Sequence, residues 1–296
     1  MPWAPSTTRA LARRAALYPS TVAVLLAVLS SLVWGSADFA GGLLARRRPA
    51  YAVVGGSQLL GLLAVGAVAV LTRAWDAPAG WLPWAMAAGL SGAAGLICFY
   101  AALGSGTMGV VASISALAAV LPVLVGVGLG ERLSVLAAVG IALAITGVVA
   151  ASGPEVHGGG SPRPIVLAGC AAVLFGLALT FIERGARFSV VLTLLGMRVT
   201  SVSLFVLAAL TARTLGGLVA RDLRLLAFVG VGDVSANLIY AVATQHGPLS
   251  VTGALGSLYP VMTVLLARLV LGERLRRLQQ AGVVAAIGGV LLVSLG

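Results

Sequence analysis

The sequence predicts an all-α integral membrane protein whose ten transmembrane helices form two inverted five-helix repeats. Three observations lead to this fold class. Hydrophobic residues make up 60% of the 296 residues, charged residues only 9%, and the mean hydropathy is +1.09, whereas soluble domains contain about 25% charged residues. The tetrapeptide Gly-Glu-Arg-Leu occurs twice, and Glu131 and Glu273 within it are 142 residues apart. Ten apolar stretches are long enough to cross a bilayer.

Each helix is predicted from the rule that a membrane span needs about 20 mostly apolar residues. In the first half this rule predicts helices over 21–45, 51–72, 81–103, 107–129 and 134–152. In the second half it predicts helices over 163–183, 189–211, 222–244, 249–271 and 278–295. The second to fifth helices and the tenth contain no charged residue at all.

The duplication divides the chain into a first repeat, residues 1–152, a linker, 153–163, and a second repeat, 164–296. The linker is rich in Gly and Pro, as expected of a loop. Five helices are an odd number, so a repeat that begins on one side of the membrane ends on the other. The second copy is therefore inserted upside down, and inverted repeats place their substrate site near the midplane, between the halves.

The charges and the cysteines exclude several classes of function. The net charge is +11, and no residue is Lys. Because the arginines cluster between apolar runs, they indicate membrane anchoring and not a nucleic-acid partner. Cys98 and Cys170 lie inside apolar runs, which argues against a disulfide framework or a Cys metal site, and we expect no cofactor. The richness in Arg, Ala and Gly indicates a GC-rich bacterial genome.

Two segments carry a family resemblance: Trp-Gly-Ser-Ala-Asp-Phe at 34–39 and the run over 237–275 that ends in the second Gly-Glu-Arg-Leu. With them the chain resembles the drug/metabolite transporter superfamily, of the ten-helix EamA type, over essentially its whole length. The first copy departs from the second, because Ala118 stands where the second copy has Pro260. The resemblance implies a small-molecule carrier, often an exporter of amino acids, metabolites or drugs.

The resemblance also implies a multi-pass protein of the bacterial inner membrane with both termini in the cytoplasm. More loop arginines lie on the side of the membrane opposite the termini, which weakly disfavours that orientation. We nevertheless predict cytoplasmic termini. The partners expected are a small-molecule substrate and the lipid bilayer, with protons as a candidate coupling ion. The protein is expected to be a monomer or a homodimer.

Ionisable groups at bilayer depth cost several kcal/mol, so each needs a reason. Arg198 lies near the middle of its predicted helix, and Asp233 near the middle of the next. They are predicted to form an ion pair that borders the central cavity. Asn237 and Tyr240 follow Asp233 at i+4 and i+7 and share its helix face, where they would complete a polar wall. The alternatives are a snorkelling Arg198 and a helix–helix hydrogen-bond cluster without a ligand.

The remaining candidate binding residues are Trp34, Asp38, Gln58 and Tyr100. Asp38 is either a proton-sensitive carboxylate that faces a cavity or a partner of Arg46 or Arg47 nearer the surface. Gln58 either lines the site or makes a plain interhelical hydrogen bond. The Gly-Glu-Arg motifs are interpreted as structural, fixing helix junctions through capping or ion pairing.

Three functions compete. The first is a secondary transporter that works by alternating access, with a site lined by helices one, two, three, six, seven and eight. The sequence contains no Walker-type phosphate loop, so ATP is not its direct energy source. The second is a non-transporting membrane helper subunit. The third is a membrane-embedded enzyme, which the scattered acidic residues and the two His disfavour.

Overall fold

A computed structural model describes residues 20–105, 108–152, 163–214, 216–271 and 277–295. Within these ranges the chain is helical and contains no strand. The first half contains α2 (Thr21–Ala45), α3 (Ala50–Thr72), α4 (Leu82–Ser105), α5 (Met108–Ser115), η3 (Ala116–Ala119), α6 (Val120–Gly128) and α7 (Val135–Ser152). The second contains α8 (Arg163–Ala186), α9 (Val190–Ala212), α10 (Leu223–Ala243), α11 (Leu249–Gly256), α12 (Tyr259–Leu271) and α13 (Arg277–Leu295). Short 3₁₀ turns cover Ala74–Asp76, Ala79–Trp81 and Ala220–Asp222.

Local capping explains several of these boundaries. The hydroxyl of Ser20 accepts a hydrogen bond from the backbone N–H of Ala23 at the start of α2, at 3.1 Å, and Ser189 does the same for Leu192 at the start of α9. Such N-caps satisfy amides that have no partner in the first helical turn. Arg73 and Arg213 end α3 and α9 in the left-handed conformation, each with φ of 50°, so the two helices terminate alike.

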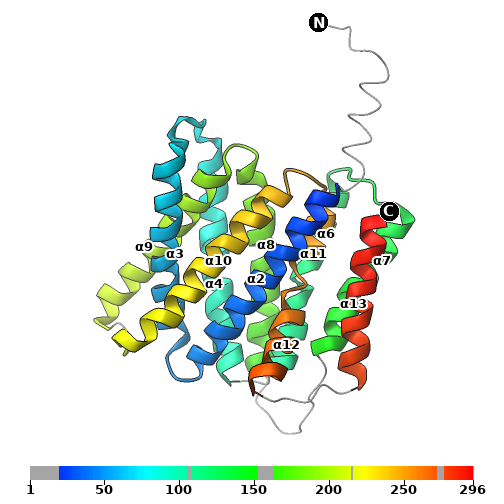
Figure 1. The fold of residues 1–296 in the computed structure, drawn as a ribbon. Coiled ribbons are helices and arrows are strands. Elements are labelled where there is room, and N and C mark those ends of the chain that lie inside the picture. The colour runs from blue at the N-terminus through cyan, green and yellow to red at the C-terminus, as the bar shows by residue number, and fades with distance from the viewer. Residues whose placement is uncertain (1–19, 106–107, 153–162, 215, 272–276, 296) are drawn as a thin grey trace, which may run out of the picture.

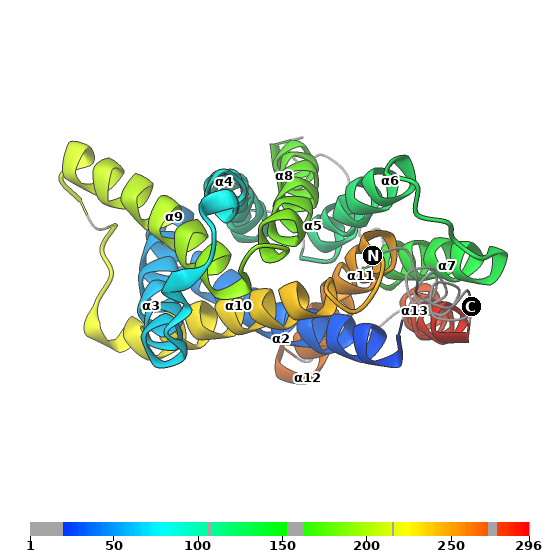
Figure 2. The same cartoon turned by 90° about the horizontal axis from the view of Figure 1, so that it is seen from above.

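Seven of the described helices are long and apolar enough to cross a membrane: Thr21–Ala45, Ala50–Thr72, Ala79–Ser105, Arg163–Ala186, Val190–Thr211, Ala220–Ala243 and Leu249–Val270. Three shorter apolar helices cover Leu117–Gly128, Val135–Ala150 and Gln280–Gly289. In Figure 1 the helices form one bundle, and α2 begins at the same end of it at which α13 finishes. Figure 2 shows α7 and α13 together at one side of the bundle.

Two of the predicted spans, 107–129 and 249–271, are not single regular helices. The first stretch is interrupted by η3 between α5 and α6, and the second by residues 257–258 between α11 and α12. Pro122 and Pro260 explain both breaks, because a proline has no N–H to donate to the carbonyl four residues earlier and its ring clashes there. The carbonyls affected are those of Ala118 and Gly256. Each proline therefore removes one hydrogen bond from the regular helical pattern at its break.

The helix contacts between the two halves occur in reciprocal pairs. The contact of α2 with α10 has its counterpart in that of α4 with α8, and the contact of α3 with α10 in that of α4 with α9. In addition, α3 packs on α9, and α7 packs on α13. Each helix of one half therefore packs on the helix of the other half that the repeat predicts, and the equivalent helix makes the equivalent contact.

Glycines make a further pair of reciprocal contacts possible. A Cβ atom on Gly35 of α2 would lie 2.3 Å from the carbonyl oxygen of Tyr259, at the second helix break. A Cβ atom on Gly176 of α8 would lie 2.8 Å from the carbonyl oxygen of Ala118, at the first break. Small residues let membrane helices approach backbone to backbone. Each half thus packs its first helix against the broken helix of the other half.

The first Gly-Glu-Arg motif joins the halves through a helix cap. The carboxylate of Glu131 accepts hydrogen bonds from the backbone N–H groups of Leu249, at 2.8 Å, and Ser250, at 2.9 Å. These are the first two residues of α11, where a negative charge also interacts favourably with the helix dipole. The interpretation of Glu131 as a capping residue is confirmed. Glu273 lies outside the described residues.

Replacing Glu131 with glutamine should therefore destabilise the fold more than it affects transport. The amide nitrogen cannot accept a hydrogen bond, so one of the two caps is lost together with the charge. We expect a loss of about 1–2 kcal/mol, measured as a lower yield and a lower unfolding temperature in detergent. The exposed Asp76 provides a control, since Asp76→Asn removes a charge without removing a cap. Normal yield together with abolished transport would contradict a structural role.

Candidate functional site

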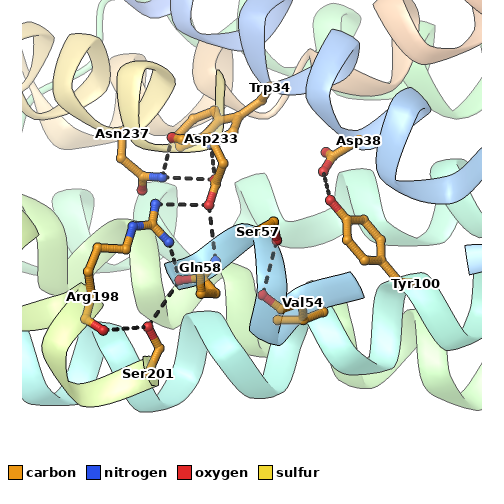
Figure 3. Close-up of polar contacts among 10 residues, drawn as sticks. All are labelled: Trp34, Asp38, Val54, Ser57, Gln58, Tyr100, Arg198, Ser201, Asp233 and Asn237. Atoms are coloured by element: carbon orange, nitrogen blue, oxygen red, sulfur yellow. Dashed lines mark hydrogen bonds and ion pairs between the residues drawn. The ribbon is translucent and has the colours of Figure 1, made fainter. Parts of the chain in front are cut away.

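A network of polar side chains joins α2, α3, α9 and α10 (Figure 3). Asp233 is its hub. Its Oδ1 accepts hydrogen bonds from Trp34 Nε1 at 3.0 Å and from Asn237 Nδ2 at 2.9 Å. Its Oδ2 lies 2.8 Å from Arg198 Nη2 and accepts from Gln58 Nε2 at 3.2 Å. Every lone-pair direction of this carboxylate is thus used, as a buried charge requires.

The guanidinium of Arg198 lies wholly inside the protein. The residue is 1% exposed, so the alternative of a snorkelling Arg198 is wrong. Besides the ion pair with Asp233, its Nη1 donates to Gln58 Oε1, which also accepts from the hydroxyl of Ser201 at 3.0 Å. The predicted Arg198–Asp233 ion pair is present. Gln58 donates to Asp233 and accepts from Arg198, so it connects the two members of the ion pair. It therefore makes more than the plain interhelical hydrogen bond that was one of its two alternatives.

Asp38 and Tyr100 form a second, smaller contact. The Tyr100 hydroxyl lies 3.5 Å from Asp38 Oδ1, and Asp38 is 8% exposed. Arg46 and Arg47 are exposed at the end of α2, and neither is in an ion pair with Asp38 among the described residues. The alternative in which Asp38 pairs with Arg46 or Arg47 is therefore wrong, and Asp38 is a buried carboxylate without a cationic partner in the described part of the chain.

Tyr240 differs from its predicted place in the polar wall. Its side chain is fully buried, and its ring packs on that of Trp34 with the centroids 5.6 Å apart. It therefore supports the indole that donates to Asp233 and does not itself line the cavity. The i+7 spacing correctly predicted the helix face, but that face turns inward against α2.

A cavity of about 60 Å³ lies between the two halves, beside the polar network. Its polar lining consists of Trp34, Asp38, Asp233 and Asn237, together with Tyr259. Its apolar lining includes Leu96, Phe175, Leu179, Ile182 and Met197. Ala118 and Gly256, which lie at the two helix breaks, also line it. A cavity of this size holds a few water molecules.

The lining positions repeat along the chain at a separation of 141 residues. Five pairs of lining residues share this separation: Trp34 with Phe175, Asp38 with Leu179, Gly92 with Asp233, Leu96 with Asn237, and Ala118 with Tyr259. The two halves therefore contribute equivalent positions to the cavity. The side chains at these positions differ in chemistry: four of the pairs join a polar or aromatic residue to an aliphatic residue or a glycine, whereas Trp34 and Phe175 are both aromatic.

Comparison with known proteins agrees with this duplicated arrangement. The model of the EamA-like transporter family matches the chain twice, over residues 21–153 and 162–295. The chain belongs to the EamA-like transporter family. It is accordingly a multi-pass membrane protein of a transporter family. A solved structure titled "Crystal structure of protein" is similar to this EamA-like chain with a TM-score of 0.74 and 21% sequence identity, over 92% of this chain and 96% of the other. That likeness shows the fold. No curated protein matched.

Several residues that line the cavity of this EamA-like protein were not predicted from the sequence. Phe175, Leu179 and Ile182 are apolar residues of an apolar helix, and nothing in their spacing distinguishes a cavity wall from a lipid-facing surface. Tyr259 had a usable signal, because it precedes Pro260, where a helix break exposes the backbone. Among the described residues no group of three or more His, Cys, Asp or Glu side chains is placed to hold a metal ion.

Proposed function

We propose that this protein is a secondary transporter that moves a small molecule across the bacterial inner membrane by alternating access. Ten helical segments, with α5–α6 and α11–α12 each counted as one broken segment, would cross the bilayer as two inverted five-helix repeats. The repeats would cover residues 1–152 and 164–296, with a linker over 153–163. The reciprocal helix contacts and the repeated packing of Gly35 and Gly176 support this arrangement.

The observation that carries the proposal is the cavity between the halves. It is bordered by a buried ion pair and lined at equivalent positions from both halves. Charges buried at this depth are costly and in membrane proteins mark substrate or ion pathways. Binding near the midplane, beside discontinuous helices, is how inverted-repeat transporters place their substrates.

Transport requires the cavity to change shape. The cavity lies between the two halves, so a substrate would enter when the halves move apart on one side. The reciprocal interfaces allow such a movement to occur on either side in turn. Export of a metabolite, amino acid or drug in exchange for protons is the form of transport we favour. Both termini would be cytoplasmic, and the protein would act as a monomer or homodimer.

A transport assay separates this function from the alternatives. Solutes that raise the unfolding temperature of the purified protein would be tested for flux into vesicles that contain it. Trp34→Phe removes the indole N–H that donates to Asp233 but keeps an aromatic ring, so we expect slower flux at normal folded yield. Trp75→Phe is the matched control, because Trp75 is 55% exposed. A folded protein that moves no solute would instead be a helper subunit.

A further inference from the structure

The charge that faces the cavity is negative. Asp38 and Asp233 both line it, whereas no Arg, Lys or His is among the described lining residues. The cation paired with Asp233, Arg198, is buried and is engaged with Asp233 and Gln58. A ligand in the cavity therefore meets carboxylates first. An anionic ligand would find no positive partner without dismantling the Arg198 network.

The two carboxylates differ in how many of their acceptor positions are used. Asp233 accepts from three donors in addition to its ion pair. Asp38 has one hydrogen bond among the described residues, at 3.5 Å from the Tyr100 hydroxyl, and a carboxylate has about four acceptor directions. Asp38 is consequently the group in the cavity with unused capacity to hold a positive charge.

Aromatic rings supply the remainder of the site. Trp34, Phe175 and Tyr259 line the cavity together with Asp38. Phe99 makes edge contacts with Phe175 and Tyr259, with centroids 5.6 Å and 6.1 Å apart, and so holds both rings in place. The faces of aromatic rings attract organic cations, and more strongly in a site from which water is excluded.

We infer that the transported substrate is an organic cation, a quaternary ammonium or a protonated amine that carries an apolar group, with Asp38 as its counter-charge. The inference rests on the proposed transporter function. In the empty site Asp38 holds a proton, because an unpaired charge at this depth is costly. When the cation binds, the Asp38 carboxyl releases that proton to solvent and becomes a carboxylate, so the net charge of the site stays unchanged. Proton and cation thus occupy the site alternately.

The surroundings of Asp38 are consistent with this exchange. Tyr100 approaches it from α4, Tyr259 from α12, and Asp233 from α10, with the Arg198 guanidinium beyond Asp233 on α9. Asp233 is already paired with Arg198, which leaves Asp38 as the lining carboxyl without a cationic partner among the described residues. The two tyrosines are neutral hydroxyls that can orient either form.

Three probes with one benzyl group and different charges test the inference by calorimetry on the purified full-length protein. They are benzyltrimethylammonium, a permanent cation, phenylalanine, a zwitterion, and phenylacetate, an anion. We expect benzyltrimethylammonium to bind and phenylacetate and phenylalanine not to bind. Release of one proton should weaken the binding of this cation by about tenfold for each unit by which the pH falls, while Asp38 is protonated in the empty site.

Asp38→Asn should lower the affinity for benzyltrimethylammonium at least tenfold and abolish its pH dependence, and its unfolding temperature verifies that it is folded. Asp76→Asn, at an exposed position, should bind as the wild type does. Cation binding that Asp38→Asn leaves unchanged would overturn the inference. So would binding of phenylalanine or phenylacetate in preference to the cation, although the transporter proposal would stand. If the folded protein moves no solute in vesicles, the transporter proposal itself is refuted.

Discussion

Replacing Arg198 with alanine is expected to destabilise the protein by about 3–5 kcal/mol, the range found when one partner of a buried ion pair is removed. The guanidinium is 1% exposed, lies 2.8 Å from Asp233 and donates to Gln58. Without it, the Asp233 charge keeps its three neutral donors, Trp34, Gln58 and Asn237, but has no counter-charge. Gln58 also loses one of the two donors to its carbonyl.

The double variant Arg198→Ala with Asp233→Ala should regain much of the lost stability, because no uncompensated charge is left in the interior. It should not regain transport, because the polar side of the cavity is gone. Thermal unfolding in detergent measures the first effect, and flux into vesicles the second. Arg224→Ala, at an exposed position in the first turn of α10, is the control and should unfold as the wild type does. A double variant less stable than Arg198→Ala would show that the ion pair is not the reason for the loss.

Gly35→Ala is expected to destabilise the protein for a steric reason. Its Cβ atom would lie 2.3 Å from the carbonyl oxygen of Tyr259 and 2.7 Å from the Cβ of Met262. The first of these is a backbone atom, which cannot rotate aside, so α2 and α12 must separate. Overpacking of this kind typically costs about 1–3 kcal/mol. The Thr263 hydroxyl, which donates to the Gly35 carbonyl at 3.1 Å, would be displaced as well.

The matched control for Gly35→Ala is Gly66→Ala in α3, where an added Cβ meets no atom within 4 Å. Alanine is a better helix former than glycine, so Gly66→Ala should be as stable as the wild type or more stable. Gly176→Ala, the reciprocal change on α8, should also destabilise, because its Cβ would approach the Ala118 carbonyl to 2.8 Å. Unfolding temperatures compare all three. If Gly35→Ala proves as stable as Gly66→Ala, the close approach of α2 to the helix break is not needed for folding.

Much of the fold followed from the sequence because membrane helices obey a simple rule of length and apolar composition. The Arg198–Asp233 pair followed because two opposite charges at bilayer depth have few other ways to be satisfied. The helix breaks did not follow, because hydropathy ignores the backbone and only Pro122 and Pro260 reveal them.

The side-chain partners of the remaining site residues could not be predicted from the sequence either. Gln58 bonds to Asp233 across 175 positions of sequence, and Asp38 contacts Tyr100 across 62. Such contacts depend on how helices rotate against one another, which a single sequence does not specify. The two alternatives for Asp38 were a carboxylate that faces a cavity and a partner of Arg46 or Arg47 nearer the surface, and only the packing of the helices separates them.

The cavity has equivalent positions from the two halves but unlike side chains at them, and this has a consequence for the ancestry of the protein. Two first halves assembled with each other would bring two Asp38 carboxylates together and contribute no Arg198. Two second halves would bring two Arg198–Asp233 pairs and replace Trp34 and Asp38 by Phe175 and Leu179. Neither self-assembly reproduces the site, so the halves have become complementary parts and depend on the peptide link that keeps them in a one-to-one ratio.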